Sequence, residues 1–365
     1  MPVLRSLAES EASPQAGVPE FLRSELESHP QLQIGQLPNG LRYVILPNPS
    51  PPMRFEAHLE VHAGSVDEQA DEQGIAHLVE HVTFLGSKKR EGLLGTGARS
   101  NAYTDFHHTV FHVHAPHANA NNGKPMLPAV LDALTEIAFE PEFLPTRIEK
   151  ERKAVTAEAQ MMNTIEYRVD CQLLQYLHWE NALGCRFPIG KMDQVQKWER
   201  DEIMSFWKKH YFPGNATLYV VGDVNIHETK QLIEETFGRA PASDEKPSPS
   251  ADALNPEILS EETSKLIREN GSNNGLLLQN AHLSPSGMIR PPVEHEWGCG
   301  PLLSNGFRAP ISVFRHRLLQ LFQLSIFCKL PIRPMKTLED LRYDGFVSLS
   351  EELLLHPVRI YSKRK

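Results

Sequence analysis

The stretch GIAHLVEHVTFLG, at residues 74–86, contains two histidines four positions apart, with a glutamate directly before the second. Its apolar residues recur with a helical period, which predicts an amphipathic helix. In a helix, positions i and i+4 lie about 40° apart around the axis and roughly 6 Å apart along it. His77 and His81 can therefore offer two imidazoles to one metal ion, and Glu80 projects to nearly the same side.

Two histidines do not complete a catalytic zinc site, which usually takes three protein ligands and leaves one position for water. The segment ERKAVTAEAQMM offers Glu151 and Glu158, which are seven positions apart and so share one face of a helix. Taken alone, two acids at this spacing are more often part of a solvated helix face. The residues by themselves therefore leave the identity of the third ligand open.

Both segments together resemble the pitrilysin/insulysin family of zinc metallopeptidases. In this family an inverted H-x-x-E-H motif is completed by a glutamate farther along the chain, within a segment like E-R-x-x-V-x-x-E. The sequence ERKAVTAE matches that segment, so the resemblance implies that Glu158 is a zinc ligand together with His77 and His81. It also implies that Glu80 is the general base that takes the proton of the attacking water. Glu151 would be an acid that orients a ligand and tunes the metal.

The segment ARSNAYTDFHHTVFHVHAP resembles the strand that borders the substrate cleft in this family. The resemblance places Asn101 and Ala102 on an exposed sheet edge, which could bind an extended peptide as an additional strand. Neither residue has distinctive chemistry, and an ordinary edge strand is an equal alternative. The nearby His108, His112 and His114 would share a strand face, but no acid or cysteine accompanies them at ligand spacing. A structural or cleft-lining role is therefore preferred to a second metal site.

The elements around these residues predict an α+β fold. The segment PNGLRYVILPN begins with a turn signal and enters a strand, and FEAHLEVHAG alternates between apolar and polar residues as a half-buried strand does. Further patterns predict helices near 126–140, 145–162, 165–180 and 199–210, a strand at 216–224 and a last helix to about 237. Because strands and helices do not alternate strictly, we expect an antiparallel sheet with packed helices. The resemblance implies a zinc domain like those of pitrilysin and the mitochondrial processing peptidases.

We expect four regions along the chain. They are an acidic N-terminal extension at 1–30, the zinc peptidase domain at 31–240, a flexible linker rich in proline, serine and acids at 241–290, and part of a second domain with a divergent tail at 291–365. In the last region, HRLLQLFQLSIFCKL is predicted to be helical or strand-like. The family's working unit has four related domains, so the resemblance implies weak activity without a complementary C-terminal half or partner chain.

Composition restricts the classes of partner. The net charge of −9 argues against nonspecific nucleic-acid binding, and no apolar run reaches the roughly 18 residues that a membrane span needs. The four cysteines form no close pair, which argues against a Cys-x-x-Cys zinc site or a disulfide framework. The N-terminal segment is acidic, unlike a transit or signal peptide, so we expect a mature sequence or one that begins after its targeting segment.

By the same resemblance, the leading function is that of a zinc metalloendopeptidase that binds one zinc ion and acts on precursor proteins or extended peptides. The sequence is most similar in wording to the plant branch of the family that removes transit peptides in the chloroplast stroma. The alternatives are a general peptide-degrading member of the family and a noncatalytic subunit that binds presequences. Noncatalytic relatives typically lose the motif residues, whereas this chain keeps them.

Overall fold

The structure is a computed structural model that describes residues 20–242, 293–296, 300–301, 303, 306, 311–319, 322–327, 329 and 335–343. The chain forms two units, one of residues 1–30 with 330–365 and one of residues 31–329. In the smaller unit, a 3-10 turn at Glu20–Arg23 leads to a bridge between Glu25 and Thr337. The linker expected at 241–290 lies outside the described residues, apart from its first two positions.

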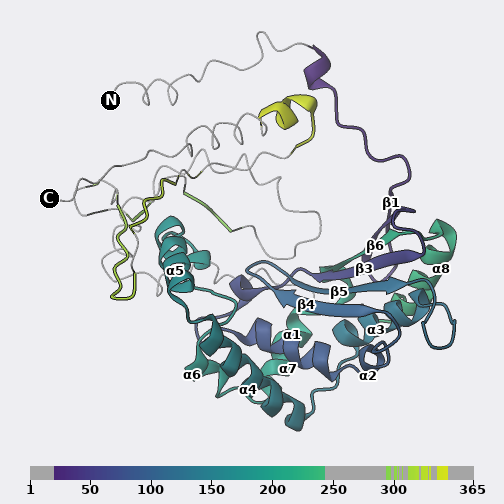
Figure 1. The fold of residues 1–365 in the computed structure, drawn as a ribbon, viewed down its shortest axis with the longest axis horizontal. Coiled ribbons are helices and arrows are strands. Elements are labelled where there is room, and N and C mark those ends of the chain that lie inside the picture. The colour runs from purple at the N-terminus through teal and green to yellow at the C-terminus, as the bar shows by residue number, and fades with distance from the viewer. Residues whose placement is uncertain are drawn as a thin grey trace. The chain divides into compact units, whose positions relative to one another are not determined.

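The larger unit is built on a six-stranded sheet (Figure 1). Across the sheet, the strands follow the order β1 (Gln33–Gln36), β2 (Arg42–Pro47), β6 (Ala216–Gly222), β3 (Arg54–Val61), β5 (Thr109–Pro116) and β4 (Arg99–Thr104). Neighbouring strands are antiparallel except β2 and β6, which are parallel. The predicted antiparallel sheet is therefore confirmed, with this one pair as an exception. A long connection lies between the two strands, and such a connection allows parallel pairing.

The sheet has one apolar and one polar face. In β3 the side chains of Phe55, Ala57, Leu59 and Val61 are buried, while those between them are exposed or half-buried. This confirms the alternation predicted for the segment. His62, which directly follows the strand, is buried and shares a hydrogen bond with Thr217 at 3.0 Å.

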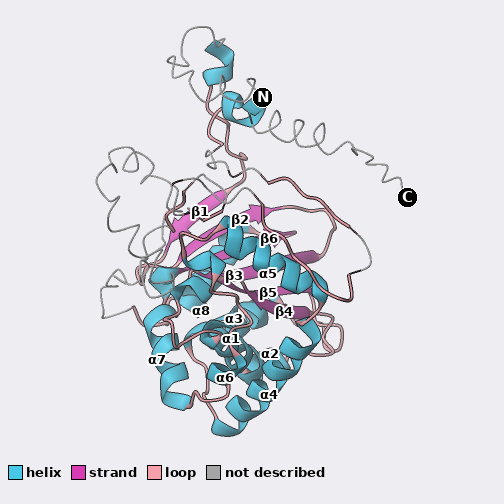
Figure 2. Ribbon diagram, turned by 90° about the vertical axis from the view of Figure 1, so that its left-hand side faces the viewer, coloured by secondary structure: helices cyan, strands magenta, loops and turns pink. Residues whose placement is uncertain are grey.

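Helices cover the apolar face of the sheet (Figure 2). Helix α1 (Ile75–Gly86) contacts β4 and β5 and packs against α3 (Leu127–Phe139), α4 (Pro145–Met162) and α7 (Arg200–His210). Helix α8 (Ile226–Phe237) packs against α3 and β2 instead. The unit also contains α5 (Ile165–Leu177) and the short helices α2 (Lys88–Glu91) and α6 (Met192–Val195). Within the described part of the unit there are also 3-10 turns at Ser65–Asp67, Ala182–Gly184 and Pro213–Asn215. The α+β class is confirmed, and most predicted helices agree to within a few residues.

Two segments differ from the prediction. The strand-like NAYTDFHHTVFHVHAP is a hairpin of β4 and β5, because Asp105 Oδ1 accepts hydrogen bonds from the backbone N–H groups of His107 and His108 and turns the chain. In HRLLQLFQLSIFCKL, the described residues belong to no helix or strand. Several of its apolar side chains are exposed, such as Phe322 and Ile326. Short segments form regular structure mainly when they bury an apolar face.

Candidate metal centre

Helix α1 is fixed at its N-terminus by Glu68, a buried residue of the acidic loop before it. The two carboxylate oxygens of Glu68 accept hydrogen bonds from the N–H groups of Gly74 and Ala76, both at 3.0 Å. An acid at this position satisfies N–H groups that have no partner within the helix and complements the helix dipole. The sequence analysis missed this residue, although an acid shortly before a helical pattern is a known start signal.

The chain crosses itself closely at the same point. Gly74 has a φ of 98°, and a Cβ added there would lie 2.9 Å from the Cα of Gly190. Only glycines permit this approach of two backbones. The loop that contains Gly190 thereby sets the position at which α1 begins.

Three side chains from two helices converge beside the sheet. Nε2 of His77 and Nε2 of His81 lie 3.7 Å and 3.5 Å from the same Oε2 of Glu158, which α4 contributes. The two imidazole rings are nearly perpendicular, with centroids 4.7 Å apart. Two ligand atoms of a tetrahedral zinc site lie about 3.3–3.5 Å apart, as follows from metal–ligand distances near 2.1 Å. The distances from Glu158 Oε2 to the two imidazole nitrogens are close to that value.

The donor set and its protonation suit a zinc ion. Burial, and then the neighbouring His81, lower the pKa of His77 to about 3, so its imidazole is neutral at physiological pH. A neutral imidazole is the form that binds a metal. Nδ1 of His77 is buried without a hydrogen-bond partner among the described residues. Two imidazoles and a carboxylate form a set that is typical of catalytic zinc.

Glu80 is buried beside this set. Its Oε2 lies 3.9 Å from Nε2 of His77 and accepts a hydrogen bond from Thr104 Oγ1 at 3.2 Å. Burial raises the pKa of Glu80 to about 8, the bond from Thr104 opposes that shift, and the nearby Glu158 adds to it. A carboxylate with a pKa near neutrality is suited to general base chemistry.

Glu80 and the two histidines also lie close enough to one another to hold an ion without Glu158. The geometry favours the predicted division of roles all the same. Glu158 faces the Nε2 atoms of both histidines, whereas an ion-pair distance joins Glu80 to His77 alone. The assignment of Glu158 as ligand and Glu80 as base stays a prediction.

Glu151 lies behind the ring of His81. Its Oε2 is 3.6 Å from Nδ1 of His81, and its Oε1 accepts a hydrogen bond from Arg147 at 3.2 Å. The carboxylate is 1% exposed. This is the position expected for an acid that orients a metal-binding histidine through its second nitrogen.

The strand β4 forms one edge of the sheet and, among the described residues, pairs only with β5. Asn101 and Ala102 lie on this strand, Asn101 exposed and Ala102 packed partly against the core. Thr104, from the same strand, reaches Glu80. The structure therefore places the open edge next to the convergent side chains, while the role of Asn101 and Ala102 in substrate binding stays a prediction.

A pocket of about 240 Å³ adjoins the centre, and the sequence analysis did not anticipate it. His77 and Glu158 form one wall of it, and α5 contributes another. The remaining lining is mainly apolar and comes from Thr104, Phe106, Met162, Tyr167, Asp170, Cys171, Leu174, Phe187, Pro188 and Ile189. Its parts come from segments far apart in the sequence, so no local pattern reveals it.

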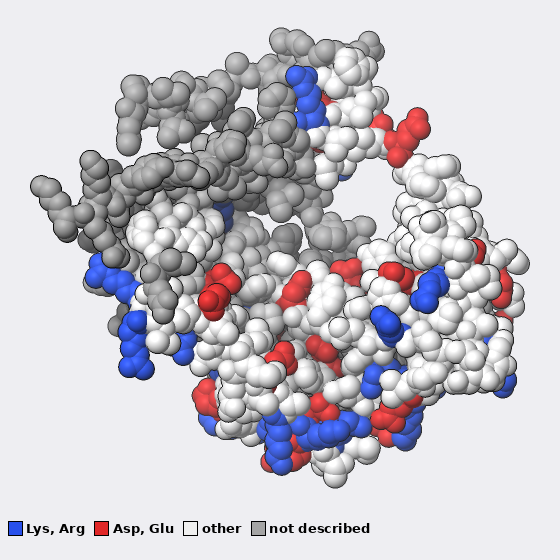
Figure 3. All heavy atoms as spheres, viewed as in Figure 1, with Lys and Arg blue, Asp and Glu red and all other residues white. Residues whose placement is uncertain are grey.

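On the face shown in Figure 3, basic side chains are interspersed with acidic ones. This distribution agrees with the net charge of −9. Within the part of the chain that the structure describes, no helix is both long and apolar enough to cross a membrane.

Comparison with known proteins identifies the class. Residues 43–182 match the family model described as "Insulinase (Peptidase family M16)", and residues 197–283 match "Peptidase M16 inactive domain". The chain belongs to peptidase family M16. Metal dependence is implied by membership of this family.

Among individual relatives, the chain is 54% identical to the chloroplastic stromal processing peptidase of Pisum sativum over 329 residues, which cover 88% of this chain and 26% of the relative. It is 53% identical to the stromal processing peptidase of Arabidopsis thaliana over 335 residues, with the same two coverages. The chain thus spans about a quarter of the length of these curated relatives.

Solved structures agree with the fold. The first half of the periplasmic protease PqqL from Escherichia coli has a TM-score of 0.55 and 30% identity, covering 60% of this chain and 48% of that one. The ferredoxin protease FusC, solved in complex with Arabidopsis ferredoxin, has a TM-score of 0.53 and 25% identity, covering 61% and 25%.

Proposed function

We propose that this chain contributes the zinc-binding, catalytic domain of a metalloendopeptidase that removes transit peptides from precursors imported into the chloroplast stroma. The observation that carries the proposal is the convergence of His77, His81 and Glu158 beside the buried carboxylate of Glu80. The similarity to stromal processing peptidases supports the substrate class and the compartment. Residues 31–240 would form the zinc domain.

One zinc ion held by His77, His81 and Glu158 would supply a Lewis acid that polarises a peptide carbonyl and lowers the pKa of water. Glu80 then has the proton-transfer role: its carboxylate takes a proton from the attacking water and passes it to the leaving amine. The hydroxyl of Thr104 holds that carboxylate in place.

Substrate binding would use the edge of β4. An extended precursor segment can pair with its free backbone groups as an additional strand, next to Asn101 and Ala102. The adjoining pocket of about 240 Å³ would then receive one substrate side chain. The ferredoxin complex of FusC supports a protein, rather than a small molecule, as the partner of this fold.

The test compares the 365-residue chain with its Glu80→Gln variant, which keeps the shape of the side chain and loses the proton acceptor. Zinc content is measured by atomic absorption, and cleavage is measured on a chloroplast precursor that carries its transit peptide. We expect about one tightly bound zinc ion per chain in both proteins. Cleavage at a single junction should fall by about 10²–10⁴-fold in the variant.

Because the chain spans about a quarter of its relatives, the assay is run with and without the separately produced C-terminal part of a stromal processing peptidase. Cleavage at many sites would favour a general peptide-degrading enzyme. Zinc and precursor binding without any cleavage, in both arms, would favour a noncatalytic presequence-binding subunit. Loss of zinc from Glu80→Gln would make Glu80 a ligand.

A further inference from the structure

A second group of histidines lies on the polar face of the sheet, away from the helices. His58 on β3 is directly opposite His112 on β5, and His114 is two positions farther along β5, opposite Glu56. Residues two apart on a strand share a face, and side chains directly opposite each other on paired strands are in contact. The register of one strand pair therefore brings all four side chains together.

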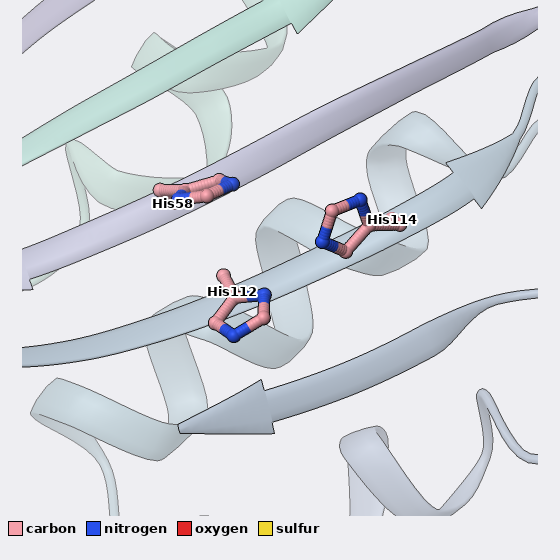
Figure 4. Close-up of side chains that lie close together, drawn as sticks. All are labelled: His58, His112 and His114. Carbon is pink, nitrogen blue, oxygen red and sulfur yellow. The ribbon is translucent and has the colours of Figure 1, made fainter. Parts of the chain in front are cut away.

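Figure 4 shows the three rings on one face of the sheet. The centroids of His58 and His112 are 5.1 Å apart, those of His112 and His114 are 5.3 Å apart, and those of His58 and His114 are 5.9 Å apart. One ring nitrogen from each residue can be chosen so that all three lie within 4.8 Å of one another. Small rotations about the side-chain bonds would bring them to the roughly 3.4 Å separation of ligands on one ion.

Glu56 holds two of the rings from behind. Its Oε1 lies 2.8 Å from Nδ1 of His114, and its Oε2 lies 3.3 Å from Nε2 of His58. Each of these histidines keeps its other ring nitrogen for a further partner. A carboxylate bound to one nitrogen of a histidine, with the metal on the other, is the usual arrangement around protein-bound zinc.

The third ring, that of His112, has no ion-pair contact with Glu56. Nδ1 of His112 is buried and has no hydrogen-bond partner among the described residues. A buried polar atom without a partner is costly, so its presence between two other histidines calls for an explanation. An ion shared by the three rings provides one.

A further set of possible ligands is formed by His178, Glu180 and His295, but its acid is already paired with a lysine. There the ammonium of Lys329 contacts Glu180 directly, so that a cation already neutralises the acid. In the sheet cluster, the ion-pair partners of the carboxylate of Glu56 are the histidines themselves.

We propose that His58, His112 and His114 bind a second divalent ion of the zinc, copper or nickel type, with Glu56 orienting two of the rings. Imidazole is a preferred ligand of these metals, and three imidazoles with one open position form a known zinc geometry. The site is half-exposed and its rings must rotate to meet an ion, so it binds more weakly than the centre beside Glu80.

The experiment is a calorimetric titration of the metal-stripped, full chain with ZnCl₂. We expect two classes of site, and the weaker class should disappear in a His58→Ala/His112→Ala/His114→Ala variant. The matched control is His108→Ala, since His108 directly precedes β5 and forms ion pairs with Asp105 and Glu60 instead. It should leave both classes intact.

The two sites are separated by a His77→Ala/His81→Ala variant, in which the tighter class should be lost while the weaker class persists. This variant therefore tests the second metal site independently of the proposed peptidase function. Glu56→Gln should weaken the second class by about 10–100-fold without removing it.

Circular dichroism checks the fold of each variant. If the triple variant unfolds, His112→Ala alone decides the question, because it removes one ring and leaves both contacts of Glu56 in place. We then expect a loss at least as large as the 10–100-fold of the Glu56 change. A single class in the wild-type chain, or an unchanged weaker class in the histidine variants, would overturn the proposal.

Discussion

The two histidine clusters of this domain use the same side chain on different scaffolds. In the helix cluster, His77 and His81 come from one buried helix and meet a carboxylate from another. In the sheet cluster, His58, His112 and His114 lie on paired strands and are half-buried. Helical spacing supplies two ligands locally, whereas the sheet assembles its set only through strand register.

The clusters also differ in the acids that surround them. The helix cluster has one carboxylate facing both rings, a second behind His81 and a third, Glu80, with a raised pKa. In the sheet cluster, Glu56 has both of its oxygens engaged by histidines. A metal ion in the helix cluster would have a general base beside it, whereas a metal ion in the sheet cluster would not. We therefore expect hydrolysis to depend on the neighbouring acids and not on the number of histidines.

The largest effect is expected from removing a ligand of the helix cluster. His77→Ala, His81→Ala or Glu158→Ala should each abolish tight zinc binding and peptide hydrolysis, because two ligands do not retain a catalytic zinc ion. His112→Ala is the matched substitution on the sheet and should leave both properties intact. Zinc retained after dialysis and the cleavage rate are the measurements. Full zinc occupancy in all three variants would refute the site.

The next effect tests the scaffold under α1. Gly190 and Gly123 both have a φ of 70°, but a Cβ at Gly190 would lie 2.3 Å from the Cα of Gly74, while one at Gly123 meets nothing within 4 Å. Gly123→Ala should therefore cost roughly 1–2 kcal/mol from the backbone conformation alone. Gly190→Ala should cost roughly 2–5 kcal/mol, because overpacking is added. Urea denaturation measures both.

Zinc titration of the same two variants sharpens the comparison. Gly190→Ala should also lower the zinc affinity of the helix cluster, because it displaces the start of α1. The zinc affinity of the sheet cluster should be unchanged. Equal destabilisation by the two substitutions would show that the close crossing of backbones contributes nothing.

A smaller effect is expected from the acid behind His81. Glu151→Gln should reduce zinc affinity by about 10–100-fold, as changes beside a ligand usually do. Glu149→Gln is the control, because Glu149 is exposed on the same helix and pairs with Arg152 and Lys153. Equilibrium dialysis against a zinc chelator gives the affinities. A loss as complete as that of Glu158→Ala would make Glu151 a ligand.

Local patterns in the sequence were sufficient to predict most helices of the fold and part of the candidate metal centre. The period of residues 74–86 predicts α1 and the shared side of His77 and His81, whereas the prediction of Glu158 needs the resemblance to the family. The hairpin and the sheet cluster depend on strand register, which the sequence does not state: His58 and His112 are 54 positions apart in number and opposite in space. Glu56, the acid of that cluster, lies on β3 two positions before His58, and only the strand register brings it opposite His114.

The close crossing of backbones at Gly74 lies beyond local patterns in a different way, because it depends on the path of a loop that returns from residue 190. Glu68 is different, since its bonds to the start of α1 are local and its place before the helical pattern could have revealed it. The pocket beside the centre, like the crossing, combines residues from 77 to 189. Sequence periodicity predicts what an element buries, and it does not predict which distant loop meets its end.

The smallest predicted effect concerns the link between β4 and the base. Thr104 Oγ1 donates a hydrogen bond to Glu80 at 3.2 Å, which favours the ionised carboxylate and so lowers the pKa of Glu80. Thr104→Ala removes that bond, and the pKa of Glu80 should rise. A general base works only when ionised, so the acidic limb of the pH–rate profile should move to higher pH by up to about one unit, or 1.4 kcal/mol. Thr104→Ser keeps the hydroxyl, so its acidic limb should stay at the wild-type pH.

The measurement is kcat/KM for a peptide substrate between pH 5 and 9, together with zinc content, which neither change should alter. A uniform loss of rate at every pH would instead mean that Thr104 acts on the shape of the β4 edge and not on the proton of Glu80. Among the described residues, the histidines of the sheet cluster share no hydrogen bond with Glu80 or Thr104, so His112→Ala should leave the acidic limb where it is. A shift in that variant would couple the two clusters and break the distinction between them.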